Sequence, residues 1–408
     1  MFYNIHMDAI EMLGSMGDLS STEVDECDHR GLDEPSVRFG WHQSRHSSNL
    51  PGQNQMKDPA RQNIHRAILP GGGNIRLLKT MQTSVCEHNC NYCGFRAQRD
   101  LKRITFTPDE MATTFLALQR AGIVEGLFLS SGVINGGARS QDRILATAEL
   151  LRRRYQYQGY MHLKLMPGVQ KAQMEQAIKF ADRISINIES PNPTRLALLA
   201  PEKAFYEELV LPFQWMNEIR MASDPRLAWR KHWPSMTTQF VVGGVGETDL
   251  ELLQTTSNLV DQYHLSRAYF SGFNPVRETP LEDVPRLNPW REVRLYQASY
   301  LLRDYGYHLE ELVFQSDHNL PLECDPKVRW ANDHLLNEPI ELNQAERQEL
   351  LRIPGIGPRS VASILSERAR GSRVSEPGQL RRFGIIPARA IPYILLNGRR
   401  PARQPVLF

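Results

Sequence analysis

Short apolar runs alternate with segments of helical length from Leu77 to about residue 306. Six of these runs predict β-strands: Leu77–Thr83, Gly126–Ser130, Tyr160–Met166, Arg183–Ile188, Thr237–Val242 and Arg267–Phe273. Six strand-then-helix units predict a parallel sheet with right-handed crossovers. We therefore expect an α/β fold, and a partial (β/α)6 TIM-type barrel fits better than a flat doubly wound sheet, although periodicity alone does not separate the two. In both architectures a ligand binds at the C-terminal ends of the strands.

The clearest predicted helix spans residues 109–121. Met111, Phe115 and Leu118 fall on one face of it, which is the pattern of a helix packed against a core. Thr107 is a suitable N-cap and Pro108 suits the first turn. These residues predict where the helix begins as well as the face that it buries.

The two ends of the chain differ from this repeating middle. Residues 15 to about 65 are polar and keep no helical or strand period, so we expect little regular structure there. We divide the chain into an irregular N-terminal extension (1–70), the barrel (71–320), a linker (321–344) and a small all-α C-terminal domain (345–408). The apolar runs fall short of the roughly 18–20 residues that a membrane span needs, and the acidic first 14 residues are unlike a signal peptide. We expect a cytoplasmic protein without a membrane segment.

Charge is distributed unevenly along the chain, although the net charge is only +2. Residues 345–408 hold 12 Arg, no Lys and 4 Glu, a net charge of +8, which leaves −6 on residues 1–344. A basic tail on a mildly acidic body indicates a tail that faces a polyanion.

Three of the five cysteines, Cys86, Cys90 and Cys93, follow the first predicted strand within eight residues. Such clustering is typical of metal ligation rather than of a disulfide framework. Three thiolates on one tight loop can ligate three irons of a [4Fe-4S] cubane and leave the fourth iron open to a small molecule. Zinc bound by the three cysteines and His88 is the alternative, although it would need unusually tight turns, and a loop without ligand is the third. The lone residues Cys27 and Cys324 are more typical of inert thiols.

The C-x3-C-x2-C loop resembles the signature of the radical S-adenosylmethionine (SAM) superfamily, and the resemblance covers roughly residues 75–320. It implies a [4Fe-4S] cluster, SAM as cofactor, an external electron donor, and reductive cleavage of SAM to a 5′-deoxyadenosyl radical. It also implies cofactor contacts at strand ends: Ser130, Ser131 and Gly132 with the methionine amino group, Ser185, Asn187 and Glu189 with the ribose or methionine, Gly243 and Gly244 with adenine, and Tyr92 against the cluster or adenine. Taken singly, these short motifs are equally typical of turns and of polar barrel residues.

Four other polar residues lie at predicted strand ends: His162, Lys164, Asn274 and Arg277. They are candidates to hold the substrate or the cofactor carboxylate, and they are equally typical of a polar barrel layer. The Gly71–Gly73 run lacks the Lys-Ser/Thr of a phosphate-binding loop, so we expect it only to shape the entry to the first strand.

The segment Glu349–Arg368 reads as helix, glycine hairpin, helix, and resembles the helix-hairpin-helix DNA-binding motif. Gly355 and Gly357 allow the backbone amides to approach a phosphate. A degenerate copy follows, with helices at 379–383 and 388–396 and a turn between them. Predicted phosphate contacts are Arg359, Arg381, Arg382 and Arg389, and binding of this kind is sequence-tolerant and salt-sensitive. A helical appendage that stabilises the barrel or binds a protein is the alternative.

Barrel and tail together resemble radical SAM proteins assigned to DNA modification or repair, through the segments Phe128–Val133, His162–Gly168 and Ser185–Glu189. The resemblance implies an enzyme that acts on DNA, with a target base extruded from the duplex if the base is what reacts. Three alternatives remain: a radical SAM enzyme acting on RNA or a small molecule, a non-catalytic zinc-containing DNA-binding protein, and a scaffold whose tail binds a protein.

Overall fold

A computed structural model describes residues 12–13, 63–68 and 74–402 of the 408-residue chain. The predictions for most of 1–70, for Cys27 and for Gly71–Gly73 fall outside these residues. No helix in the described part of the chain is long and apolar enough to cross a membrane. The described chain forms two compact units: residues up to Glu189 with Leu196–Gln239 and Phe273–Pro285, and Ser190–Arg195 with Phe240–Gly272 and everything from Arg286 onward.

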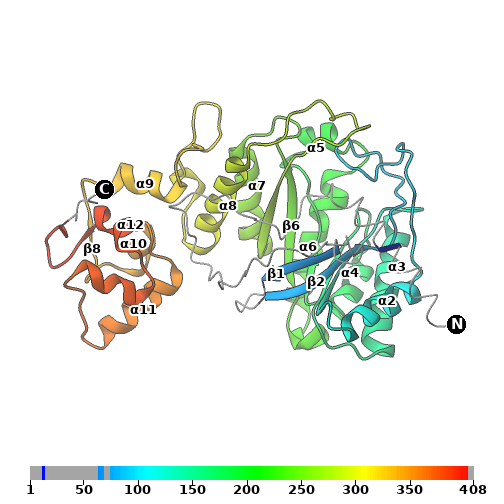
Figure 1. The fold of residues 1–408 in the computed structure, drawn as a ribbon, viewed down its shortest axis with the longest axis horizontal. Helices are drawn as coiled ribbons and strands as arrows, with labels where there is room; N and C mark the ends of the chain where they lie inside the picture. The colour runs from blue at the N-terminus through cyan, green and yellow to red at the C-terminus, as the bar shows by residue number, and fades with distance from the viewer. Residues whose placement is uncertain (1–11, 14–62, 69–73, 403–408) are drawn as a thin grey trace, which may run out of the picture. The chain divides into compact units, whose positions relative to one another are not determined.

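The strands are β1 (Ile64–Ile68), β2 (Asn74–Met81), β3 (Gly126–Ser130), β4 (Met161–Lys164), β5 (Arg183–Ser185), β6 (Ser235–Val242), β7 (Arg267–Gly272), β8 (Ile340–Glu341) and β9 (Ile394–Leu395). The α-helices are α2 (Pro108–Arg120), α3 (Gly137–Glu149), α4 (Lys171–Ile178), α5 (Pro193–Leu199), α6 (Leu211–Ala222), α7 (Asp249–Tyr263), α8 (Pro289–Asp304), α9 (Pro326–His334), α10 (Arg347–Arg352), α11 (Pro358–Ala369) and α12 (Pro387–Ala390). Figure 1 traces this alternation from blue to red.

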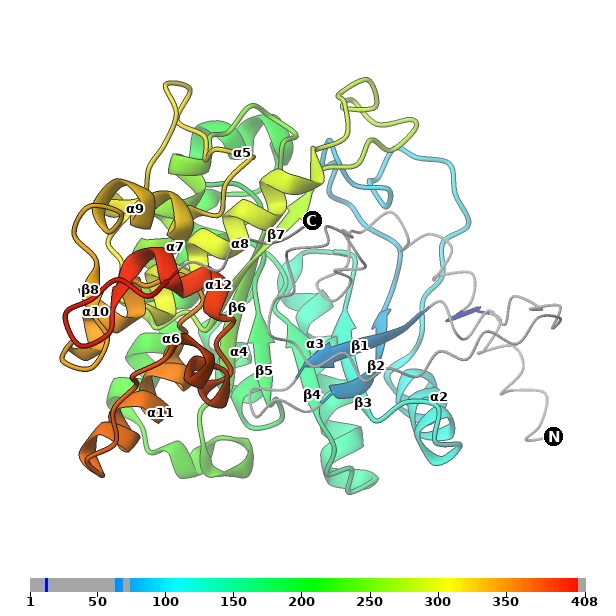
Figure 2. The same cartoon turned by 60° about the vertical axis from the view of Figure 1, so that its left-hand side comes forward.

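Strands β1 to β7 form one sheet in chain order. Neighbouring strands from β2 to β6 are parallel, and the six predicted strands are all present, several of them shorter than predicted. The partial barrel fold is therefore confirmed. Figure 2 shows β3, β4 and β5 side by side.

Strand β1 was not predicted, and the expectation of an irregular extension is wrong for Ile64–Ile68. These residues pair antiparallel with β2, from Ile64 opposite Leu78 to Ile68 opposite Asn74. Its partner β2 begins only six residues further along the chain, but a five-residue strand interrupted by His65 and Arg66 has a weak local pattern.

The two faces of the sheet differ in chemistry because side chains alternate along each strand. Leu78, Leu127 and Leu163 lie on the same face and are fully buried. Helix α3 lies on this face too, since Thr147 Oγ1 donates to Gln82 Oε1 at 2.8 Å. The opposite face is the barrel interior, and it carries many polar side chains.

Helix α2 confirms its predicted start. The Thr107 side chain accepts a hydrogen bond from the Glu110 amide at 3.3 Å, and the Glu110 carboxylate accepts one from the Thr107 amide at 2.7 Å. This reciprocal capping box satisfies two backbone donors that the first turn would otherwise leave unpaired.

Residues 345–402 are mostly helical, and their core is shared with the preceding segment, since Ala331 and Leu335 on and just after α9 and Leu342 belong to it. Helices α10 and α11 flank a turn at residues 353–357, and a 3-10 helix, η7 (Pro377–Phe383), follows. The second predicted helix of the degenerate copy is wrong beyond Tyr393, because Ile394–Leu395 is β9, which pairs with β8 in a short parallel sheet. Pro392 has no amide hydrogen with which to continue a helix. The predicted linker contains α9 and β8, and the proposed domain boundaries stay a prediction.

Candidate active site

The cysteine loop leaves β2 and runs without regular structure to α2. Cys90 is buried, and Cys86 and Cys93 are half-buried; all three are free thiols. The Cys93 amide donates to the Cys90 carbonyl at 3.3 Å, and the Phe95 amide donates to Cys93 Sγ at 3.4 Å. The loop therefore turns tightly around its last two cysteines, and a backbone donor already points at one sulfur.

Arg103 holds this loop together from inside. Its Nη1 donates to the carbonyls of Ser84 and Phe95, both at 2.7 Å, and its Nη2 donates to the carbonyl of Arg96 at 2.6 Å. The guanidinium also lies within electrostatic reach of the Cys86 and Cys93 thiols. One side chain thus fixes both ends of the cysteine segment and brings positive charge to the sulfurs.

Gly132 lets the end of β3 lie against the cysteine loop. Its amide donates to the Thr83 carbonyl at 2.7 Å, and a Cβ added at this position would lie 2.0 Å from the Val85 carbonyl oxygen and 3.2 Å from Cys86 Cβ. Ser130 and Ser131 are buried beside it. The structure therefore brings the predicted Ser-Ser-Gly segment to the first cysteine, as expected for strand ends that meet at one edge of a sheet.

The end of β5 supplies buried oxygen atoms. Ser185 Oγ lies 2.8 Å from His162 Nε2. Asn187 Oδ1 and Glu189 Oε2 are buried without a hydrogen-bond partner. Buried polar atoms are nearly always paired in native proteins, so orphaned ones indicate a ligand that would complete them.

Lys203 joins this strand end to the cysteine loop. Its Nζ lies 2.9 Å from Glu189 Oε1, and both side chains are buried. Burial opposes the charge on each partner, but their mutual attraction outweighs it, so the pKa of Lys203 is raised and the pKa of Glu189 is lowered. Lys203 is also within electrostatic reach of Cys90. Burial first and then the Glu189 carboxylate raise the pKa of Tyr92 well above its usual value, which locates Tyr92 at the same site.

The segment after α5 packs on the cysteine loop. The Asn91 amide donates to the Leu199 carbonyl at 2.8 Å, and the Asn89 amide donates to Glu202 Oε2 at 2.9 Å. The sequence did not single out Lys203 or Arg103, because their contacts are made only in the folded chain. Arg103 is one of several basic residues that follow the motif, and Lys203 lies 110 positions after Cys93, so the sequence holds no signal specific to either of them.

The residues present fit a [4Fe-4S] cluster and SAM by the chemistry of their donors. Three thiols from one loop suit an iron-sulfur cluster, and orphaned oxygens at the end of β5 suit the hydroxyl and amino groups of a nucleoside cofactor. No three His, Cys, Asp or Glu side chains in the described ranges are grouped closely enough to hold one metal ion. Burial lowers the pKa of His88, the fourth ligand of the zinc alternative.

Gly243 and Gly244 belong to the other compact unit. Gly243 has φ +93°, and a Cβ there would lie 2.6 Å from a methyl carbon of Leu287. Its amide donates to the Glu247 carboxylate. Tight packing and a positive φ already explain why a glycine occupies position 243. Its predicted approach to adenine therefore stays a prediction.

The C-terminal hairpin presents glycine backbone at its tip. Gly355 is exposed with φ +82°, and a Cβ there would lie 3.0 Å from Arg389 Cβ. Gly357 is the N-cap of α11. Arg359, Arg381 and Arg382 are exposed, and Arg389 is half-buried. The structure thus brings Arg389 to the hairpin, and it leaves the other three predicted phosphate contacts on the surface.

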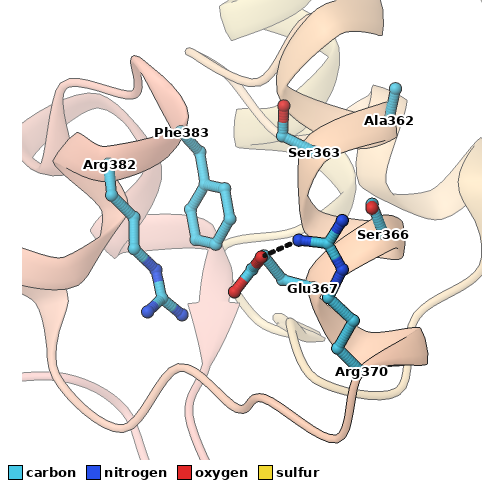
Figure 3. A pocket seen from close by; sticks show the side chains of 7 residues that line it. All are labelled: Ala362, Ser363, Ser366, Glu367, Arg370, Arg382 and Phe383. Carbon is cyan, nitrogen blue, oxygen red and sulfur yellow. Dashed lines mark hydrogen bonds and ion pairs between the residues drawn. The ribbon is translucent and has the colours of Figure 1, made fainter.

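An open groove of about 580 Å³ lies between α11 and η7. Figure 3 shows its lining: Ala362, Ser363, Ser366, Glu367, Arg370, Arg382 and Phe383. Arg370 Nη1 donates to Glu367 Oε1 at 3.2 Å, and the Arg382 guanidinium lies over the Phe383 ring, 4.7 Å from its centroid. The lining therefore carries two guanidiniums, two serine hydroxyls and one carboxylate, and the carboxylate is paired with Arg370.

Comparison with known proteins supports the iron-sulfur interpretation of the cysteine loop. Residues 81–257 match the family model described as the Radical SAM superfamily. No curated protein matches the chain. Solved structures that resemble it include HydG, a maturase of the [FeFe]-hydrogenase (12% identity, TM-score 0.43, 56% of this chain and 49% of that one), and methylornithine synthase (16%, 0.42, 56% and 62%). A radical SAM methyltransferase from Sphaerobacter thermophilus also resembles it (13%, 0.42, 59% and 70%).

The family match covers the cysteine loop, Gly132, the end of β5 and Lys203. It favours an iron-sulfur cluster over the zinc alternative, since the three thiols lie inside a domain of known cluster chemistry. We conclude that residues 81–257 form a radical SAM domain, the domain of a superfamily of enzymes that use a [4Fe-4S] cluster and S-adenosylmethionine.

Proposed function

We propose that this chain cleaves SAM reductively and uses the resulting radical to modify or repair DNA. The observation that carries the first part is the juxtaposition of three thiols, held by Arg103, with orphaned buried oxygens at the end of β5. In this proposal one electron from an external donor splits SAM into methionine and a 5′-deoxyadenosyl radical, which takes a hydrogen atom from the substrate.

The chain's own residues bind, orient and exclude water. Cys86, Cys90 and Cys93 would hold the cluster, and Gly132 keeps the end of β3 close to the first of them. Asn187 Oδ1 and Glu189 Oε2 would accept hydrogen bonds from the cofactor. Lys203 neutralises the buried Glu189, so that the site does not add an uncompensated negative charge beside an anionic cluster.

The DNA part of the proposal is supported by the C-terminal hairpin. Exposed backbone at Gly355, the start of α11 and the arginines around it provide donors and positive charge for a phosphate. Arg370 and Arg382 in the adjoining groove extend this basic surface. Since such contacts reach the backbone and read no bases, we expect binding to tolerate any sequence.

Anaerobic reconstitution with iron and sulfide, followed by assay of 5′-deoxyadenosine release under a strong reductant, tests the chemistry. The Cys90→Ala variant should lose release and cluster absorbance, whereas Cys324→Ala, which alters a thiol outside the loop, should keep both. A colourless wild-type protein that releases no 5′-deoxyadenosine would refute the proposal.

Duplex DNA added to the same assay, together with direct binding measurements, tests the substrate. The double variant Gly355→Arg and Gly357→Arg should bind duplex DNA at least tenfold more weakly despite its added charge, because the new side chains cover the hairpin amides. Gly378→Arg, at an exposed glycine with no neighbour within 4 Å, is the matched control. Equal DNA affinity in the folded double variant, with release unaffected by DNA, would favour an RNA or small-molecule substrate.

A further inference from the structure

A row of polar side chains crosses the barrel interior below the strand ends. The register aligns Lys79 on β2 with Phe128 on β3, Phe128 with His162 on β4, His162 with Arg183 on β5, and Arg183 with Ser235 on β6. Residues aligned across a parallel sheet point to the same face. The row therefore sets two cations and a histidine into the barrel interior.

A second row lies one step nearer the C-terminal ends. Lys164 aligns with Ser185, and Ser185 aligns with Thr237. Each step of two residues along a strand advances by about 7 Å, so Lys164 lies above the first row and beside the hydroxyl of Ser185. Strands of a barrel curve around its interior, so side chains from β2, β4 and β5 converge there.

His162 lies within electrostatic reach of Lys79, Lys164 and Arg183. It is fully buried, stacks on Phe128 with ring centroids 4.3 Å apart, and lies 2.8 Å from Ser185 Oγ. Burial lowers its pKa well below the usual value, and Arg183, Lys164 and Lys79 each lower it further. Three cations therefore act on one neutral imidazole. The nearby Glu189 carboxylate is paired with Lys203, and Lys164 is also close enough to lower its pKa.

A second observation points to a ligand on this face. Thr237 Oγ1 is buried and has no hydrogen-bond partner. Thr237 can donate to an anion, and it lies in the same row as Lys164. Cations that share one inward face with an unsatisfied hydroxyl are an arrangement that an oxyanion can complete.

We propose that Lys79, Lys164 and Arg183 form an oxyanion site in the barrel interior that holds a phosphate or carboxylate group of the substrate. This inference rests on the proposed function, which it deepens by naming the chemical class of substrate. Lys164 lies in the same row as Ser185, a predicted cofactor contact, whereas Lys79 and Arg183 belong to the row about 7 Å further from the strand ends.

Titration calorimetry on the reconstituted full-length protein saturated with SAM tests the site, with inorganic phosphate and acetate as separate probes at constant ionic strength. Lys164→Met and Arg183→Gln should each weaken binding of the preferred anion about tenfold, the loss expected for one charged hydrogen bond. Lys171→Met, which removes a lysine of α4 that pairs with Glu218 of α6 on the surface, should bind as the wild type does. The tighter of the two probes identifies the acidic group as phosphate or carboxylate.

Two results would overturn the site: unchanged anion binding in Lys164→Met and in Arg183→Gln, or an anion that binds the SAM-free protein but not the SAM-saturated one, which would make the cations part of the cofactor site. Lys79→Met provides an independent variant if Arg183→Gln fails to fold, and iron content with circular dichroism checks each protein. The titration needs no reductant and no turnover. An anion that binds while no 5′-deoxyadenosine forms would therefore refute the proposed function and leave the oxyanion site intact.

Discussion

Gly132 determines how closely β3 can approach the cysteine loop, because its hydrogen lies where a methyl group would meet backbone. Gly132→Ala places a Cβ 2.0 Å from the Val85 carbonyl oxygen, and backbone cannot move aside as a flexible side chain can. We expect the variant to lose about 2 kcal/mol of stability and to bind less iron per chain. Gly378→Ala, with no atom within 4 Å, should change stability by less than about 0.5 kcal/mol. Wild-type iron content in Gly132→Ala would show that the contact is not needed.

Arg103 acts through the loop rather than on a substrate, so it is a positioning residue. Arg103→Met removes hydrogen bonds to three loop carbonyls at 2.6–2.7 Å and the charge near two cysteines. We expect iron content to fall severalfold, and Arg103→Lys to recover part of it, because an ammonium keeps the charge but not the planar fork of donors. Iron analysis and the cluster's reduction potential check this. Arg153→Met, which alters an exposed arginine paired with Glu149, is the control.

For individual residues, the sequence predicts a site only where the residues of that site lie close together along the chain. The three cysteines lie within eight residues, so their grouping is visible without a structure. Arg103 contacts Ser84 from 19 positions away, and Asn89 contacts Glu202 from 113 positions away. Such residues meet because the folded strands and loops bring them to the same edge of the sheet, and no local sequence pattern indicates these contacts.

Helix α9 meets the C-terminal hairpin through a buried lysine. Lys327 Nζ donates to the Ile356 carbonyl at 2.6 Å and lies 4.5 Å from the centroid of the Tyr305 ring. Burial is the main reason that its pKa falls to about 7. The hairpin is thus fixed by a side chain that loses its charge more easily than lysines usually do.

This lysine makes the stability of the helical region depend on pH. In the unfolded chain Lys327 stays protonated up to about pH 10.4, whereas in the folded chain it is neutral above about pH 7. Unfolding between these values takes up a proton, so the Lys327 contribution to stability rises from pH 7 toward 10.4 and is lowest below 7. Between pH 7.5 and 9.5 the wild type should gain about 2 kcal/mol relative to Lys327→Met. Urea unfolding at both pH values, followed by tryptophan fluorescence, measures it; parallel curves would contradict the assignment.

Helices and strands were predicted best where the residues within the element itself determine its structure. The capping box at Thr107 gave the start of α2 correctly, and six strands were found because each alternates with a helix. β1 and β9 were missed because each is short, and β9 is in addition stabilised by a strand distant in the sequence. In the degenerate hairpin copy a helix was predicted too far along the chain. The residues after Tyr393 have a helical composition, but they form β9 because they pair with β8.

For the whole molecule, the basic charge is concentrated in the tail, so the salt dependence of DNA affinity is a suitable test of DNA binding. Four arginines, Arg359, Arg381, Arg382 and Arg389, were predicted to contact phosphates, which gives a slope of log affinity against log salt of about −4. Arg381→Gln with Arg382→Gln should reduce the slope to about −2 and weaken binding equally for all sequences. Arg226→Gln, which alters an exposed arginine of the body, should leave the slope unchanged. A slope that does not change in the double variant would remove these two arginines from the interface.

Strand β1 has a practical consequence for anyone who shortens the chain. It covers the outer edge of β2 over five residues, and an uncovered strand edge is a template for pairing with another molecule. Removing the polar N-terminal residues is attractive for crystallisation, but a chain that starts after Ile68 would expose that edge. Trimming should therefore stop before Ile64, or the shortened protein should be expected to self-associate through β2.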